Sequence, residues 1–194
     1  MATPATRENQ SDLELAGAIL ARDRKATARL VELHTDSVYR YVWRRMTPKV
    51  DMVDDVVQET FIAAWGSMRT YSGEASLRTW LMGIARNKVE DHYRRTLKQS
   101  LIDLESEPDQ PMVAAFDIDR ELDANRQAKR AAGVLAELPY EYSAALRWRY
   151  WDGRSAREMA AATGKTEKAV ERLLARAREQ FKTRWLETKG ASDG

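Results

Sequence analysis

The sequence predicts an all-α protein made of two small helical domains joined by an acidic linker, the second domain carrying a helix-turn-helix. Three observations lead to this fold class. Apolar residues recur every three or four positions along most of the 194 residues, as on one face of a helix. Alternating runs bounded by turn residues, the mark of strands, are lacking. Between Leu97 and Asp123, eight Asp and Glu occur against two Lys and Arg, a composition typical of a solvated tether.

The first domain is predicted over residues 11–98, after a disordered N-terminus at 1–10. Ser11 and Glu14 form a capping-box pattern, so a helix is expected from Ser11. A second helix is expected over about 24–46. Its apolar stripe consists of Val31, Val38, Val42 and Met46, with Leu30 and Tyr41 beside it.

Two further helices complete this domain. Asp51 is expected to cap a third helix, which has Val53, Val57, Phe61 and Trp65 in its core. Ser76 is expected to cap a long fourth helix after the loop at 71–75. Its inward face carries Leu77, Trp80, Leu81, Ile84 and Ala85.

An acidic linker is predicted over 99–117, a second domain over 118–187 and a tail over 188–194. Helical periodicity returns near Ile118 and continues to about Leu138. Pro139 suits the first turn of the next helix, at about 139–151, because a proline there loses no helical hydrogen bond. Asp152 and Gly153 then form a turn.

The segment Ser155 to Arg178 predicts a helix-turn-helix. Gly164 suits the turn because glycine adopts positive φ freely, while Ala160 and Val170 are spaced to pack where two helices cross. The second helix buries a stripe of Val170, Leu173, Leu174, Ala177 and Phe181. Its outward face carries Glu167, Lys168, Glu171, Arg172, Ala175 and Arg176.

Local charge supports nucleic-acid binding by this segment. The whole chain has a net charge of only +2, yet Arg147 to Arg184 holds eleven Lys and Arg against five Asp and Glu. Arg172 can donate to guanine and Glu171 can accept from cytosine N4. A solvated helix with Glu–Lys pairs in a small bundle has the same pattern, so both interpretations stay open on spacing alone.

The sequence argues against an enzyme. Cysteine is absent, which excludes disulfides and thiolate metal sites, and we expect no metal and no cofactor. His34 and His92 each lie within an apolar helical pattern and are expected to be core histidines. No phosphate loop, HExxH or nucleophile elbow occurs. No segment resembles a signal peptide or a membrane span, so a cytoplasmic protein is expected.

Two blocks resemble a known family. DDVVQETFIAAW (54–65) and YSGEASLRTWLMGIARNKVEDHYRR (71–95) resemble region 2 of extracytoplasmic function (ECF) σ factors. The stretch from Leu138 to Phe181 resembles their region 4. The resemblance implies an alternative σ factor that binds core RNA polymerase, recognises the −35 and −10 promoter elements and initiates transcription. A stand-alone helix-turn-helix regulator is the alternative.

The resemblance also implies residue roles in region 2. Core polymerase, through the clamp helices of its β′ subunit, would contact the acidic face of the third helix, although an ordinary solvated surface would look the same. The −10 strand would meet the loop and the long helix. Tyr71 either stacks on a flipped base or covers the core. The core-binding candidates are Asp54, Asp55, Gln58 and Glu59, and the −10 candidates are Tyr71, Ser72, Gly73, Asn87, Asp91, Arg94 and Arg95.

Region 4, by the same resemblance, would contact the β flap and read the −35 element. Where family members often have a lysine in the middle of this helix, this chain has Glu171 followed by Arg172, so a borrowed −35 consensus is not expected to apply. The acidic linker would thread toward the polymerase active centre, and an anti-σ factor is a candidate partner. The −35 candidates are Lys165, Thr166, Lys168, Glu171, Arg172, Arg176 and Arg178; the linker candidates are Asp103, Glu105, Glu107 and Asp109.

Overall fold

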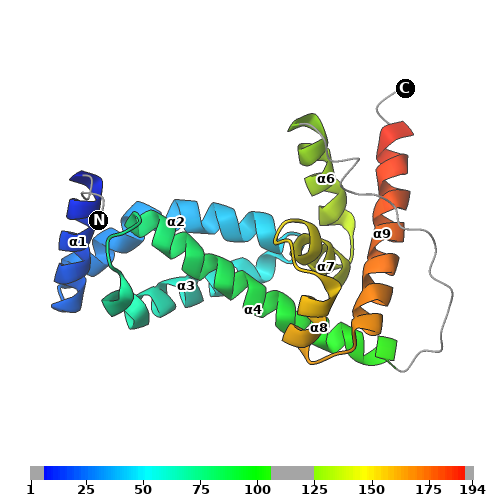
Figure 1. Ribbon diagram of the computed structural model, residues 1–194. Coiled ribbons are helices and arrows are strands. Elements are labelled where there is room, and N and C mark those ends of the chain that lie inside the picture. Colours follow the sequence, from blue (N-terminus) through cyan, green and yellow to red (C-terminus); the bar gives the residue numbers. More distant parts are fainter. Residues whose placement is uncertain (1–6, 106–124, 191–194) are drawn as a thin grey trace. The chain divides into compact units, whose positions relative to one another are not determined.

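The computed structural model describes residues 7–105 and 125–190, and every element in those ranges is a helix (Figure 1). The all-α prediction is therefore confirmed for these ranges. The described residues form two compact units. The first contains the residues up to Met46 together with Val50–Val89; the second contains Thr47–Lys49 and the residues from Glu90 onward. No helix in the described ranges is both long and apolar enough to cross a membrane.

The first unit is a bundle built around α2. Its elements are α1 (Arg7–Leu20), α2 (Arg24–Met46), η1 (Val50–Met52), α3 (Val53–Ser67), η2 (Met68–Thr70) and the first half of α4 (Leu77–Glu105). α2 packs against both α1 and α3. Leu30, Leu77 and Leu81 are fully buried in a core cluster to which α1 contributes Ala16 and Ile19. Burial of this shared apolar face is what holds the four helices together.

The second unit is organised by α9 (Glu167–Gly190). α6 (Asn125–Glu137), α7 (Tyr140–Tyr150) and α8 (Ala156–Thr163) all pack on it (Figure 1). Leu135, Leu146 and Phe181 lie in its core, and Phe181 stacks on Trp185 with ring centroids 5.7 Å apart. The predicted stripe of α9 is confirmed, since all five of its residues are at least 97% buried.

The start of the first helix differs from the prediction. α1 begins at Arg7, so Ser11 lies inside the helix rather than at its cap, and residues 7–10 are not disordered. Residues 1–6 lie outside the described ranges. Contacts far along the chain explain the earlier start: Asn9 bonds to Gly73, and Asp12 bonds to Leu77. A capping pattern read from local sequence cannot anticipate such contacts.

Two predictions about α3 are wrong. The helix begins at Val53, its cap is Met52 without a side-chain bond, and Asp51 belongs to η1. Trp65, expected in the core, keeps 41% of its surface exposed and lines a groove with α2. Val53, Val57 and Phe61 are buried as expected. Ser76 does cap α4, since its hydroxyl accepts from the backbone N–H of Thr79.

The predicted linker begins too early. α4 continues to Glu105, and its last turns bury Leu97, Leu101 and Leu104, so the apolar stripe outlasts the change in composition. Asp103 and Glu105 are helical, while Glu107, Asp109 and the rest of 106–124 lie outside the described ranges. α9 runs to Gly190, past the expected start of the tail at 188.

Candidate nucleic-acid interface

The helix-turn-helix is formed by α8, a three-residue turn and α9. Gly164 ends α8 in the left-handed region, at φ 68°, and its N–H donates to the carbonyl oxygen of Ala160. The next N–H, that of Lys165, donates to the same oxygen at 3.1 Å. Thr166 then caps α9, because its hydroxyl accepts from the N–H of Ala169. Ala160 and Val170 are both buried, as the expected crossing requires.

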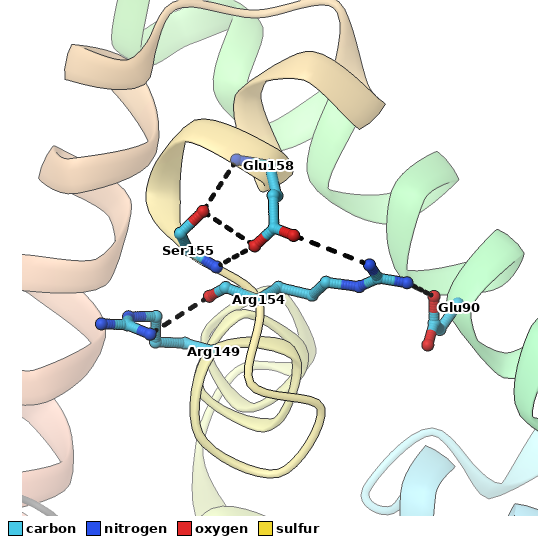
Figure 2. A network of polar contacts seen from close by, with 5 residues as sticks. All are labelled: Glu90, Arg149, Arg154, Ser155 and Glu158. Atoms are coloured by element: carbon cyan, nitrogen blue, oxygen red, sulfur yellow. Dashed lines mark hydrogen bonds and ion pairs between the residues drawn. The ribbon is translucent and has the colours of Figure 1, made fainter.

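A capping box fixes the start of α8 (Figure 2). The N–H of Glu158 donates to the Ser155 hydroxyl at 3.2 Å, and the N–H of Ser155 donates to the Glu158 carboxylate at 2.8 Å. The Ser155 hydroxyl donates to the same carboxylate oxygen. The two bonds that the Glu158 carboxylate accepts, from the Ser155 N–H first and then from the Ser155 hydroxyl, lower the pKa of Glu158 from its usual value. Two backbone donors that a helix start leaves unpaired are thereby satisfied.

Arg154 ties this turn to α4 within the second unit. Its guanidinium donates to the Glu90 carboxylate at 2.8 Å and lies 4.0 Å from that of Glu158 (Figure 2). The hydrogen bond and the charge of Glu90 raise the pKa of Arg154, so it carries its positive charge throughout the accessible pH range. Arg149 donates to the carbonyl oxygen of Arg154 from α7. The loop before α8 is thus held from both sides.

The outward face of α9 is only partly open. Thr166, Lys168 and Arg176 are exposed, and the other four −35 candidates, Lys165, Glu171, Arg172 and Arg178, are half-buried. Arg178 donates to the carbonyl oxygen of Leu174 on its own helix. Arg172 donates to the carbonyl oxygen of Leu104, at the end of α4, at 2.8 Å. The guanidinium expected to reach a base edge therefore has an intramolecular acceptor in this structure.

The loop before α4 is built around a buried tyrosine. Tyr71 is 91% buried, its ring lies 5.5 Å from that of Trp80, and its hydroxyl donates to the carbonyl oxygen of Ala75. Burial, and then the charge of Asp12, raise the pKa of this hydroxyl. Of the two roles left open, Tyr71 covers the core in this structure, and its stacking on a flipped base stays a prediction. Ser72 is exposed beside it.

Gly73 meets two requirements at once. Its φ is +75°, a region that disfavours side chains, and a Cβ there would lie 2.9 Å from the Leu13 side chain of α1. Its carbonyl oxygen accepts from the Asn9 amide at 3.0 Å. Glycine is thus the residue that this contact between helix and loop can accommodate.

The −10 candidates on α4 are polar and mostly open. Asn87, Arg94 and Arg95 are exposed, while Asp91 is half-buried. Asp91 accepts from the Arg94 guanidinium at 2.8 Å, an exposed pair one turn apart. Such a pair stabilises little on its own, which leaves the arginine able to exchange its partner for a phosphate.

The acidic face of α3 is confirmed as a surface. Asp54, Asp55 and Gln58 are exposed, while Glu59 is half-buried with its carboxylate 3.9 Å from the Lys88 ammonium. The same side continues into apolar side chains, Ile62 at 54% exposure and Trp65. Acidic groups beside exposed apolar ones are typical of a protein interface, with charge setting register and packing supplying affinity.

Comparisons with known proteins decide the family. Residues 30–99 match the model for Sigma-70 region 2, and residues 130–181 match that for Sigma-70, region 4. The RNA polymerase sigma factor CnrH of Cupriavidus metallidurans is 30% identical over 177 residues, covering 88% of this chain and 92% of CnrH. The chain belongs to the ECF σ factors. It is an alternative σ factor, a class that binds core RNA polymerase, recognises promoters and initiates transcription.

A second relative agrees with this assignment. The σ factor NccH of Alcaligenes xylosoxydans xylosoxydans is 31% identical over 174 residues, with 88% of this chain and 92% of NccH covered. The solved structure of CnrH in complex with the cytosolic domain of CnrY is 28% identical and covers 89% of this σ factor and 95% of that chain, with a TM-score of 0.41.

Sequence reasoning missed several residues that shape these surfaces. Ser155 and Glu158 follow the capping-box spacing, so a signal for them was present. Asn9, Asp12 and Leu13 act on a loop sixty or more positions away, and Arg154 acts on Glu90 at a similar separation. Nothing in local spacing marks such partners.

Proposed function

We propose that this σ factor contacts the polymerase and the −10 element through α3, α4 and the loop before α4, and that it reads the −35 element through α9. The observation that carries this proposal is the order of surfaces along the chain: an acidic and apolar face on α3, then a polar side on α4, then a helix-turn-helix with a basic recognition helix.

On the DNA side, Arg172 is proposed to read a base, and Arg176 and Lys168 to contact phosphates. A recognition helix reads bases with residues near its N-terminus and meets the backbone with later ones. Glu171 accepts from a cytosine in this scheme. Lys165, Thr166 and Arg178 complete the proposed −35 set. Loss of a base contact changes preference, whereas loss of a phosphate contact weakens all sequences alike.

For the −10 element, the proposal assigns the exposed Ser72 and its buried neighbour Gly73 in the loop before α4, together with the polar side of α4. Asn87 is suited to a base edge, and Arg94 and Arg95 to phosphates, with Asp91 orienting Arg94. Tyr71 supports this loop from beneath.

For the polymerase, the proposal assigns Asp54, Asp55, Gln58 and Glu59 to the clamp helices of β′. This surface provides exposed carboxylates next to Ile62, which fits a basic and apolar partner helix. The β flap is the proposed partner of the second unit.

The test is reconstitution with core RNA polymerase. Co-elution in gel filtration and specific run-off transcripts are expected. Tight operator binding by the chain alone, without co-elution, would instead support the stand-alone regulator.

Charge reversal at Asp55 tests whether the acidic face of α3 binds core polymerase. Asp55→Lys is expected to weaken co-elution, with Glu14→Lys as the control because Glu14 is exposed on α1, outside the proposed surface. Unchanged circular dichroism together with unchanged affinity for core would refute the assignment.

Three further statements belong to the same proposal. The chain itself performs no catalysis, because RNA synthesis belongs to the polymerase, and it acts in the cytoplasm where the polymerase is. An anti-σ factor is a proposed partner, as the resemblance to the ECF family implies. Addition of such a protein is expected to abolish the run-off transcript.

A further inference from the structure

Three residues of helix α1 contact the loop before α4 and the start of α4. The Asn9 amide donates to the carbonyl oxygen of Gly73 at 3.0 Å. The Asp12 carboxylate accepts from the N–H of Leu77, the first residue of α4, at 2.7 Å. The side chain of Leu13 closes over Gly73, so closely that an added Cβ would lie 2.9 Å away. The three residues span little more than one turn of α1, so they act as one rigid surface.

We infer that α1 is the positioning helix of the −10 loop: Asn9, Asp12 and Leu13 hold residues 71–76 in the conformation that receives the unpaired −10 base. This inference rests on the proposed assignment of the loop to the −10 element. It adds residues that touch no DNA in the proposal and act through the loop.

The Asp12 bond has the geometry of a helix cap supplied from another helix. An unpaired N–H at a helix start is satisfied by a carboxylate, which also interacts favourably with the positive end of the helix dipole. Ser76 satisfies the N–H of Thr79, and Asp12 satisfies that of Leu77. The loop therefore ends at a defined point, because the first turn of α4 is held by both.

The loop also has internal supports, and they leave a gap that α1 fills. The Tyr71 hydroxyl bonds to Ala75, and the Tyr71 N–H bonds to the carbonyl oxygen of Met68. These bonds fix the two ends of the turn. Asn9 and Leu13 hold its apex at Gly73, between them.

Holding the apex matters because capture of a flipped base rewards preorganisation. A loop that is already in the bound conformation avoids the entropy cost of ordering at the moment of binding. A loosened loop accepts several bases in several poses. Loss of the α1 contacts is therefore expected to reduce discrimination among −10 bases more than it reduces transcription overall.

The test compares holoenzymes made from core polymerase and full-length σ variants. The probe is a library of promoter duplexes randomised at the −35 and −10 positions and read by sequencing the transcripts. Asp12→Ala and Asn9→Ala are each expected to flatten base preference at one or two −10 positions by about 3- to 10-fold, the usual effect of one hydrogen bond. The −35 preference is expected to stay unchanged.

Two matched variants serve as controls. Glu14→Ala and Gln10→Ala remove exposed side chains of the same helix that make no contact with the loop among the described bonds, and wild-type preference is expected. Asp12→Asn keeps an oxygen acceptor without the charge and is expected to recover at least half of the lost preference. A partly unfolded σ factor lowers transcription from all templates equally, so the ratio between bases reports positioning rather than stability.

A double-mutant cycle tests the steric contact between Leu13 and Gly73. Gly73→Ala is expected to flatten −10 preference, since the new methyl meets Leu13 and the positive φ is strained. The double variant with Leu13→Ala is expected to be less impaired than Gly73→Ala alone. Strict additivity of the two changes would show that Leu13 does not bear on the loop.

The outcomes separate the inference from the proposed function. If the Asp12 and Asn9 variants keep wild-type −10 preference while Asn87→Ala changes it, α1 is not a positioning helix and the proposed −10 surface stands. If none of these variants, Asn87→Ala included, changes −10 preference while specific transcripts persist, the −10 assignment fails and the inference fails with it.

Discussion

Removal of the Ser155 hydroxyl is expected to loosen the first helix of the helix-turn-helix. Ser155→Ala deletes the acceptor for the N–H of Glu158 and the donor to its carboxylate, the bonds at 3.2 and 2.8 Å. The backbone bond from the Ser155 N–H to Glu158 survives. A lost N-cap of this kind costs about 1 kcal/mol, within a range of about 0.5–2 kcal/mol. The cost falls on opening of α8, because the bonds close within its first turn.

Amide hydrogen exchange measures this opening directly. A loss of about 1 kcal/mol corresponds to about fivefold faster exchange of the amides in the first turn of α8, if these exchange by local opening. Amides in the middle of α9, near Ala177, are expected to keep their rates. Ser155→Thr is the control, since its hydroxyl can replace both bonds. Unchanged exchange in Ser155→Ala would show that the capping box does not stabilise α8 in solution.

Three further results are expected. The pKa of the Glu158 carboxyl, followed by NMR, should lie below the usual value of about 4.5 and should move toward that value in Ser155→Ala. Because the folded pKa is lowered, the contribution of the ionised carboxylate to stability is present above about pH 4.5 and is lost as the pH falls through the folded value. Burial lowers the pKa of His34, against the opposing charge of Asp12, so the folded state resists protonation of this side chain. The urea midpoint should therefore be highest above about pH 6.5 and should decrease as the pH falls below that value. His34→Gln should reduce this decrease, and an equal decrease in the variant would contradict the assignment to His34. Phe181→Ala should cost about 3–5 kcal/mol in urea unfolding, because the ring is 99% buried and stacks on Trp185, whereas Gln180→Ala, at an exposed position, should cost little.

Long periodic segments could be predicted from the sequence. The range 24–46 matches α2 in full, and Gly164 ends α8 in the left-handed conformation expected of it. Both features depend on neighbours within a few residues: an apolar stripe repeats every turn, and a positive φ selects glycine. The cap at Ser76 succeeded for the same reason.

Failures occurred where a distant partner competes with a local signal. Ser11 carries a good capping pattern, yet the helix starts earlier because the residues around it bond to the 73–77 segment. Trp65 falls on the apolar period of α3, yet it keeps 41% of its surface exposed and lines a groove with residues of α2. Acidic composition predicted the end of α4, whereas the buried Leu101 and Leu104 extend it. Composition reports solvent preference, and burial is decided by tertiary packing.

Arg172 shows why a surface predicted from sequence differs from a surface available for binding. Its place on the outward side of α9 follows from helical geometry, and its half-buried guanidinium bonds to the carbonyl oxygen of Leu104. A guanine and a helix C-terminus both present oxygen acceptors to the same five donors, so the chemistry that suits Arg172 to DNA also suits it to the end of α4. The major groove is about as wide as one helix with its side chains, so α9 cannot enter it with α4 still bonded to this residue. If Arg172 reads a promoter base as proposed, this bond has to break first, and its loss is expected to lower the affinity for the −35 element.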